Sequence, residues 1–303
     1  MLRAGLLYLS ESKRLRGWLT HWSVARRMSR RFVAGEELDE AVAAARASNE
    51  QGMTVSLDYL GENVKKEGEA RAAQAVYLRM LDRIHAEGLR SNVSLKLTQL
   101  GLDLGDEFAK SLVQELVQRA ESQQNFVRID MEGSRYTQRT LDLFKALRAS
   151  SEVVGIVIQA YLYRSEQDVR DLLSIGARIR LCKGAYKEPP EIAFPHKRDV
   201  DRNFVRLMQI LLSSGIYHGI ATHDPRMIEA TIEYAAKQSL AKESFEFQML
   251  YGIRRELQRQ LVQDGYRMRV YIPFGGSWYP YLMRRLAERP ANLLFFVRSV
   301  FAR

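Results

Sequence analysis

The sequence has a single cysteine, Cys182, among its 303 residues. One cysteine excludes an internal disulfide and a zinc site built from cysteines, and it fits a reducing compartment such as the cytoplasm. We expect Cys182 to be a buried structural residue. Histidine is also scarce, and the five histidines form neither an H-x-H pair nor an H-E-x-x-H pattern. The sequence therefore predicts no metal site.

Long hydrophobic runs are absent as well. The longest apolar stretch near the middle of the chain, residues 153–163, is too short to cross a bilayer, so no transmembrane helix is expected. Two nucleotide-binding signals are also missing. There is no Walker A lysine loop and no G-x-G-x-x-G motif after a first strand.

What is present indicates a globular chain. Apolar residues make up 46% of it and charged residues 27%, and its length suits one α/β barrel. The net charge of +10 is concentrated in residues 1–33, which carry eight basic residues and one acid, interleaved with leucine and tryptophan. Such an amphipathic arm could pack on the barrel as a helix, lie on an anionic membrane surface, bind nucleic acid or be a transit peptide.

After a helix at 38–50, strand-like and helix-like stretches alternate to the end of the chain. The expected strands are 53–58, 92–97, 126–132, 153–161, 178–183, 217–223, 245–250 and 269–272. Eight strands, each followed by a helix and without hairpin signals, predict a closed (β/α)8 barrel. We expect an N-terminal helical arm at 1–50 and a catalytic barrel domain at 51–303. The longest loop, 187–195, follows the fifth strand.

Polar residues gather where these strands end, which is the catalytic face of such barrels. The set is Asp58, Lys96, Asp130, Glu132, Gln159, Tyr161, Arg180, Lys183, Thr222, His223, Gln248 and Tyr271. Charges inside strands are costly unless they are paired or used, so their concentration predicts a polar pocket.

The last helix, expected from about Trp278, carries Arg284, Arg285 and Glu288 on one face. Two adjacent guanidiniums suit a carboxylate ligand. A solvated ion-pair cluster is the alternative. With Lys96, the arginines offer positive charge for a small carboxylate, and Asp130 and Glu288 balance that positive charge.

Three other functions fit parts of the sequence. They are a lyase or aldolase that uses Lys96 or Lys183 as a Schiff-base amine, a phosphate-binding isomerase, and a basic protein that binds nucleic acid through residues 1–33.

Seven motifs in order, from about residue 53 to the end, resemble the proline dehydrogenase family in its compact bacterial monofunctional form. They are residues 94–97 (SLKL), 130–132 (DME), 159–161 (QAY), 180–186 (RLCKGAY), 221–223 (ATH), 245–252 (FEFQMLYG) and Tyr271 with 281–288 (YLMRRLAE).

This resemblance implies a distorted (β/α)8 barrel that binds FAD and oxidises L-proline to Δ1-pyrroline-5-carboxylate. The hydride would pass from proline C5 to flavin N5, and the electrons would go on to a membrane quinone. The protein would then be cytoplasmic, with peripheral contact to the inner face of the bacterial membrane through residues 1–33 and no role for nucleic acid.

The resemblance also implies roles for individual residues. Lys96, Arg284 and Arg285 would bind the proline carboxylate, and Asp130 and Glu288 would hold those cations in place or face the amine. The walls of the substrate pocket would come from Tyr186, Leu250, Tyr271 and Tyr281. The cofactor would be bound by Met131, Gln159, Arg180, Lys183, Gly184, Ala185, Thr222 and His223.

Two points stay open at this stage. The loop after the fifth strand departs from the family pattern, so His196, Lys197 and Arg198 are equal candidates for contact with the FAD phosphates. No histidine is placed as the base that takes the amine proton, so solvent or a carboxylate could serve. The sequence gives no oligomeric state.

Overall fold

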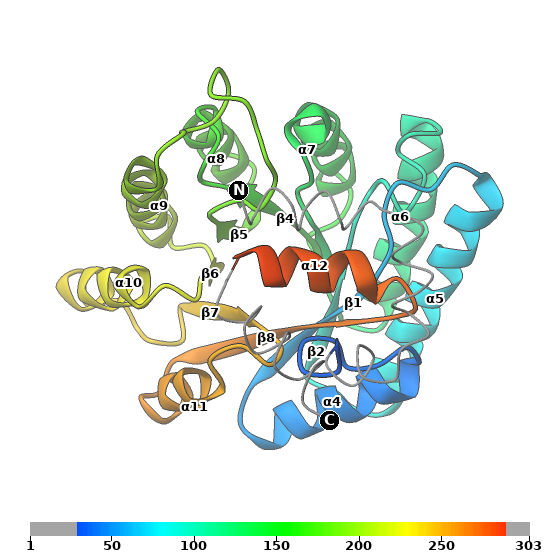
Figure 1. Cartoon of the computed structure of the whole chain (residues 1–303), viewed down its shortest axis with the longest axis horizontal. Coiled ribbons are helices and arrows are strands. Elements are labelled where there is room, and N and C mark those ends of the chain that lie inside the picture. Colours follow the sequence, from blue (N-terminus) through cyan, green and yellow to red (C-terminus); the bar gives the residue numbers. More distant parts are fainter. Residues whose placement is uncertain (1–28, 289–303) are drawn as a thin grey trace, which may run out of the picture.

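The computed structural model describes the backbone of residues 29–288 and the side chains of residues 29–283. Its eight strands are parallel and close into a barrel in chain order (Figure 1). The strands are β1 (Thr54–Tyr59), β2 (Ser91–Leu95), β3 (Val127–Ile129), β4 (Val154–Gln159), β5 (Arg178–Cys182), β6 (His218–Ala221), β7 (Phe245–Leu250) and β8 (Arg267–Phe274). The predicted (β/α)8 barrel is confirmed.

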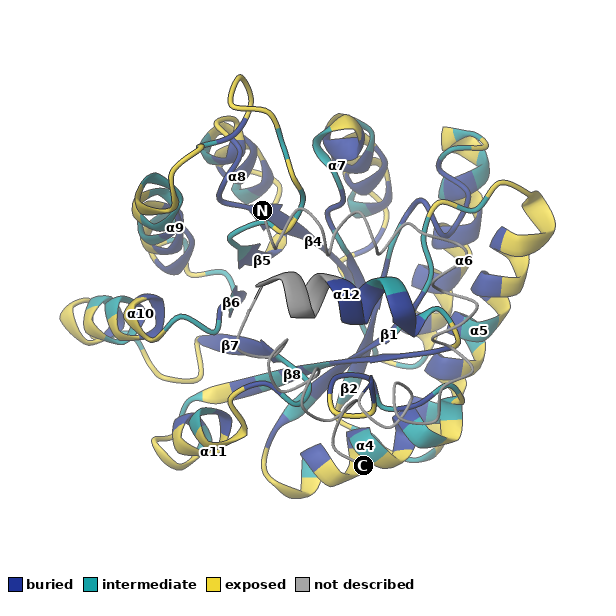
Figure 2. Cartoon of the chain, in the orientation of Figure 1, coloured by how far each residue is buried: buried dark blue, intermediate teal, exposed yellow. Residues whose placement is uncertain are grey.

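A helix follows each of the first seven strands and packs on the outside of the barrel. These helices are α5 (Glu67–Ala86), α6 (Asp106–Ser122), α7 (Ser134–Arg148), α8 (Ser165–Leu173), α9 (Lys197–Leu212), α10 (Pro225–Lys237) and α11 (Arg255–Gln263). Figure 2 shows their barrel-facing sides buried and their outer sides exposed. The strands are buried on both faces, as the continuous apolar run of β4 illustrates, because helices cover one face and the interior the other.

The eighth place in the outer ring is taken by a helix from before the barrel. Helix α4 (Leu38–Glu50) packs against β1 and β8. The helix that follows β8, α12 (Trp278–Glu288), crosses the middle of the ring instead (Figure 1). Its Trp278 and Leu282 pack with Leu60 and Ile253, which follow the carboxyl ends of β1 and β7. Helix α12 therefore covers the carboxyl end of the barrel, so the ring departs from a regular (β/α)8 barrel at this helix.

The chain just before α4 runs beside the end of β8. The Ala34 amide donates to the Pro273 carbonyl at 2.9 Å, and the Gly275 amide donates to the Gly35 carbonyl at 2.9 Å. At Gly252 (φ +74°) the backbone passes so close that a Cβ atom would lie 1.7 Å from the Arg31 carbonyl oxygen. Residues 29–36 therefore lie beside the carboxyl ends of β7 and β8.

Most strand boundaries lie within two residues of the prediction, and the differences at β3 and β8 are informative. Strand β3 ends at Ile129, three residues before the predicted 132, and β8 continues to Phe274 through Pro273. The amphipathic arm lies mostly in residues 1–28, outside the described part, and the division at residue 50 stays a prediction. Within residues 29–288, no helix is both long and apolar enough to cross a membrane.

His218, at the start of β6, makes barrel stability depend on pH. Its Nδ1 accepts from the Ile179 amide at 3.0 Å, and Ser214 lies 3.0 Å from its Nε2. Burial lowers the pKa of His218 from 6.5 to about 3. Between these values the unfolded chain binds a proton that the folded chain does not. The free energy of unfolding should therefore fall by about 1.4 kcal/mol for each pH unit below 6.5.

We expect His218→Asn, which keeps an acceptor for the Ile179 amide, to lose most of this dependence. Urea unfolding at pH 7.5 and 5.0 measures it, with His85→Asn on the exposed face of α5 as the control. Equal pH slopes for the two variants would contradict the role of His218.

Candidate active site

Four polar side chains, two from β1 and β8 and two from the residues directly after β2 and β3, meet inside the barrel at the end that α12 covers. The Lys96 ammonium donates to both oxygens of Asp58, at 3.0 and 3.2 Å, and lies 3.7 Å from Asp130 Oδ2. The Tyr271 hydroxyl donates to Asp130 Oδ2 at 2.8 Å and lies 3.4 Å from Lys96 Nζ. Their meeting follows from a closed parallel barrel, in which the carboxyl ends of all strands converge.

The charges of this group control one another. Lys96 is 12% exposed and Asp58 is 1% exposed. Burial alone would lower the pKa of Lys96, but the carboxylates of Asp58 and Asp130 outweigh it and raise that pKa. Burial raises the pKa of Asp58, whereas at Asp130 the neighbouring Arg180 and Lys96 outweigh burial and lower the pKa. Lys96 is therefore held as a cation, and Asp130 as an anion.

Arg180 is the second interior cation. Its Nη1 donates to Asp130 Oδ1 at 2.8 Å and to Ser94 Oγ at 3.1 Å, and its Nη2 donates to Ser56 Oγ at 3.3 Å. Its Nε donates to Gln248 Oε1, and its guanidinium carbon lies 5.3 Å from the centre of the Tyr271 ring. Acceptors from four other strands therefore fix the guanidinium plane.

A further ion pair lies toward the amino ends of the strands. Arg269 Nε donates to Glu246 Oε1 at 2.7 Å, and Tyr217 donates to Glu246 Oε2 at 3.0 Å. Arg269 also donates to Asn92 Oδ1 at 3.0 Å. Polar groups thus fill the barrel interior where apolar layers are usual.

Gln159 offers an acceptor at the end of β4. It is 3% exposed, and its Nε2 donates to the Met131 carbonyl at 3.2 Å. Among the described residues its Oε1 is buried without a hydrogen-bond partner, which is costly unless a ligand donor binds there. The Met131 side chain is buried in the hydrophobic core, so the backbone of Met131 is the part that reaches the site.

The ends of β6 and β7 are tied together by two predicted cofactor residues. The Leu250 amide donates to His223 Nε2 at 2.9 Å, so this nitrogen is unprotonated. The Thr222 amide donates to the Gln248 carbonyl at 3.1 Å, and Thr222 Oγ1 accepts from the Asp224 amide at 3.1 Å. Thr222 and His223 therefore connect the carboxyl ends of β6 and β7.

The loop after β5 begins with Lys183, whose ammonium is paired with Asp201 and, at 2.8 Å, with Asp224. Lys197 pairs with the same two carboxylates. Of the three open candidates, which stand at the start of α9, Lys197 is thus the one next to Lys183. Ala185, two residues further on, is exposed.

Gly184 brings this loop close to β4. Its φ is +109°, and a Cβ there would lie 2.3 Å from the Tyr161 ring. The same loop carries Glu188, whose carboxylate accepts from the Ser134 amide at the start of α7, at 2.7 Å, and from the Tyr161 hydroxyl at 3.3 Å. The loop is thereby held by contacts to Tyr161, which follows β4, and to the start of α7.

Helix α12 supplies the roof. Tyr281 is buried in the cluster with Leu282, and Leu250 packs against that cluster. Tyr186 lies within electrostatic range of Lys96. Arg284, Arg285 and Glu288 stand in the last turns of α12, but their side chains lie outside the described part of the chain. The carboxylate clamp therefore stays a prediction.

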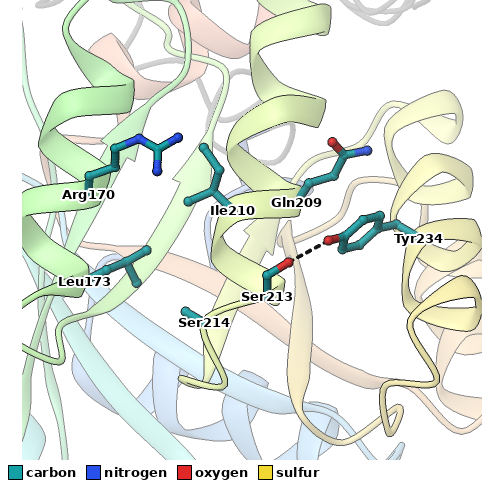
Figure 3. Close-up of a pocket in the computed structure, with 7 residues that line it drawn as sticks. All are labelled: Arg170, Leu173, Gln209, Ile210, Ser213, Ser214 and Tyr234. Atoms are coloured by element: carbon teal, nitrogen blue, oxygen red, sulfur yellow. Dashed lines mark hydrogen bonds between the residues drawn. The ribbon is translucent and has the colours of Figure 1, made fainter.

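One surface depression can be set aside. Figure 3 shows it between Arg170, Gln209, Ser213 and Tyr234, with a hydrogen bond of 2.6 Å joining the last two. These residues lie in the carboxyl-terminal halves of α8, α9 and α10 or, for Ser213, directly after α9. They are therefore at the end of the barrel opposite to the strand termini, away from Lys96.

The structure adds partners that the sequence could not assign, and it adds two residues that the sequence did not name, Ser56 and Tyr77. Asp58 is the closest partner of Lys96, a role that was expected of Asp130, and Tyr77 lies 3.5 Å from Asp58 Oδ1. Ser56 and Gln248 both contact Arg180. The period of two along β1 and β7 places these residues inside, but it does not reveal their partners.

Comparisons with known proteins agree on one family. The model of the family described as proline dehydrogenase matches residues 41–298. Proline dehydrogenase 2 of Bacillus subtilis is 43% identical over 97% of this chain and 97% of its own length. The proline dehydrogenase of Deinococcus radiodurans is 38% identical over 90% of both chains.

A solved structure agrees with the fold. Proline utilization A (PutA) from Bdellovibrio bacteriovorus, inactivated by N-propargylglycine, superposes with a TM-score of 0.83 at 29% identity. The match covers 92% of this chain and 34% of that protein, so the present chain spans about a third of its length.

The interior charge balance gives a stability prediction. Lys96→Met would leave two buried carboxylates facing each other without their shared cation, which should lower the free energy of unfolding at pH 7 by about 3 kcal/mol or more. The double variant Lys96→Met with Asp58→Asn should recover a large part of that loss. Urea unfolding of both variants measures it, and additive losses would show that the two residues act independently.

Proposed function

The chain belongs to the proline dehydrogenase family and is an enzyme of proline oxidation, and from that premise we propose that it is an FAD enzyme that converts L-proline to Δ1-pyrroline-5-carboxylate. The observation that carries the proposal is the interior group of Lys96, Asp58, Asp130 and Tyr271 under α12. It presents an ammonium that Asp58 and Asp130 keep charged near the carboxyl ends of the strands, where a small carboxylate would be attracted.

The substrate would be positioned by charge and by shape. Lys96, with Arg284 and Arg285 from the roof, would hold the carboxylate, and Tyr271, Tyr186, Leu250 and Tyr281 would surround the ring. Two arginines and a lysine at one end of a small ring would fix its orientation. A fixed orientation is the main requirement for hydride transfer from a carbon atom to a nitrogen atom in contact with it. Glu288 would balance the arginines.

The chain's own residues fit the polar edge of a flavin. Gln159 Oε1 is a buried acceptor that lacks a donor among the described residues, and Arg180, on the neighbouring strand β5, is a fixed cation in the barrel interior. Bound FAD would supply the acceptor atom, N5, for the hydride that leaves proline C5. Met131, Gly184, Ala185, Thr222 and His223 would line the cofactor, with Lys183 and Lys197 toward its phosphates.

The Schiff-base alternative is disfavoured by the electrostatics. An amine nucleophile must be neutral at working pH, which requires a lowered pKa. The pKa of Lys96 is raised, since Asp58 and Asp130 outweigh burial, and Lys183 is held between two carboxylates.

The electrons would pass to a membrane quinone. The basic arm at residues 1–33 would bring the barrel to an anionic membrane surface, and the net charge of +10 favours that contact. Binding to anionic vesicles, with and without the first 33 residues, tests this part independently of catalysis.

The decisive test is the visible absorbance spectrum of the purified protein. We expect flavin bands that bleach when L-proline is added without oxygen, because the substrate reduces the bound cofactor. D-proline serves as the control. A protein that binds no flavin, or whose flavin stays oxidised with L-proline, would overturn the proposal.

Arg285→Met tests the carboxylate clamp. One charged hydrogen-bond partner of the substrate is lost, so KM for proline should rise by about tenfold or more, while bound FAD stays intact. Arg119→Met on the exposed face of α6 is the matched control. An unchanged KM in steady-state kinetics would remove Arg285 from the clamp.

A further inference from the structure

Gln248 connects two buried charged groups of the barrel interior. One contains Arg180, and the other is the Arg269–Glu246 pair toward the amino ends of the strands. Gln248 stands on β7 and is 3% exposed. Its Oε1 accepts from Arg180 Nε, and its Nε2 donates to Glu246 Oε1 at 2.6 Å. The Gln248 amide therefore links the Arg180 guanidinium to the Glu246 carboxylate.

The direction of this amide is set from the Glu246 side. An ionised carboxylate accepts hydrogen bonds and donates none, so it selects the NH2 end of Gln248. At Glu246, Arg269 outweighs burial and lowers the pKa of the carboxyl, which is therefore an anion at neutral pH. A reversed amide would place its NH2 group against Arg180 Nε, a contact between two donors. Gln248 thus offers Arg180 an acceptor in one direction only.

A glycine on the neighbouring strand makes room for the amide. Gly219 pairs in register with Arg180 on one side and Glu246 on the other. A Cβ at position 219 would lie 2.3 Å from Gln248 Nε2 and 2.9 Å from Gln248 Cδ. An alanine here would force the amide to move.

We propose that Gln248, oriented by Glu246 and given space by Gly219, is a positioning residue that aims the Arg180 guanidinium and thereby sets the reduction potential of the flavin. This inference rests on the proposed function, in which Arg180 lies beside the flavin. A cation held near the ring stabilises the reduced, anionic form, and the benefit depends on where the charge sits. Losing the Gln248 acceptor leaves a buried Arg180 donor unpaired, and the guanidinium must turn to find another partner.

The test uses the FAD-loaded full-length chain with Gln248→Met, which keeps the length of the side chain and removes the acceptor. We expect a more negative midpoint potential in spectroelectrochemical titration and a kcat about tenfold lower. The proline KM should stay within about twofold, because the Lys96–Asp58 pair is untouched. Gly219→Ala should shift the potential in the same direction.

Two matched controls separate positioning from general damage. Gln74→Met removes another buried glutamine, which bonds the Leu112 carbonyl and Glu115 between α5 and α6. Gly68→Ala adds a methyl group where nothing lies within 4 Å. Both should keep the potential of the unmodified protein.

An unchanged potential in both Gln248→Met and Gly219→Ala would overturn the inference. Loss of FAD from both, with the controls still loaded, would overturn it too, because Gln248 would then be needed to form the cofactor site and not to aim Arg180. If one variant loses FAD, the potential of the other decides. Failure of the proposed function is distinguishable, since it appears in the unmodified protein as missing flavin or as flavin that proline does not reduce.

Discussion

The balance between buried cations and buried carboxylates inside the barrel is the constraint on which the rest of the structure depends. Lys96 and Arg180 stand opposite Asp58 and Asp130, and Arg269 stands opposite Glu246. Each charge would cost several kcal/mol if it were buried alone, and each is tolerated because partners from neighbouring strands surround it. The barrel must therefore close in one register, since a slip by one residue would turn these side chains outward and leave their partners unpaired.

The same balance would prepare the proposed site for its substrate. In the proposed function, an incoming carboxylate would meet a Lys96 ammonium that is already desolvated and held by Asp58. Little rearrangement would then be needed on binding, which is the advantage of an electrostatically preorganised site. The roof comes from α12, whose apolar residues seal it against Leu60 and Ile253, while the loop after β5 is held by Glu188 at the start of α7. The buried charges around Lys96 and the apolar residues of α12 thus lie at the same end of the barrel.

The sequence predicted the barrel because its alternation of apolar strands with helices is strong and local. It also predicted that Lys96, Asp130, Arg180 and Tyr271 would meet, since strand ends converge in such a fold. It could not assign partners. Asp130 and Glu132 stand two apart and would share one face of a longer strand, but β3 ends at Ile129 and Glu132 turns away to Thr98, bonding its hydroxyl at 2.6 Å. The positions of α4 and α12 were likewise hidden, because an amphipathic period shows that a helix has a buried face and not which surface covers it.

The place of α4 in the outer ring has a consequence for how such a scaffold can change. Because α4 packs on β8 and β1, the outer layer of the barrel is complete without α12. Helix α12 is thus not needed to cover the outside of the barrel, and it can be exchanged, lengthened or tilted as a cap. Evolution, or a designer, could graft a different cap at Gly275 and Gly276 to admit another cyclic amine while the barrel and its buried charges stay as they are.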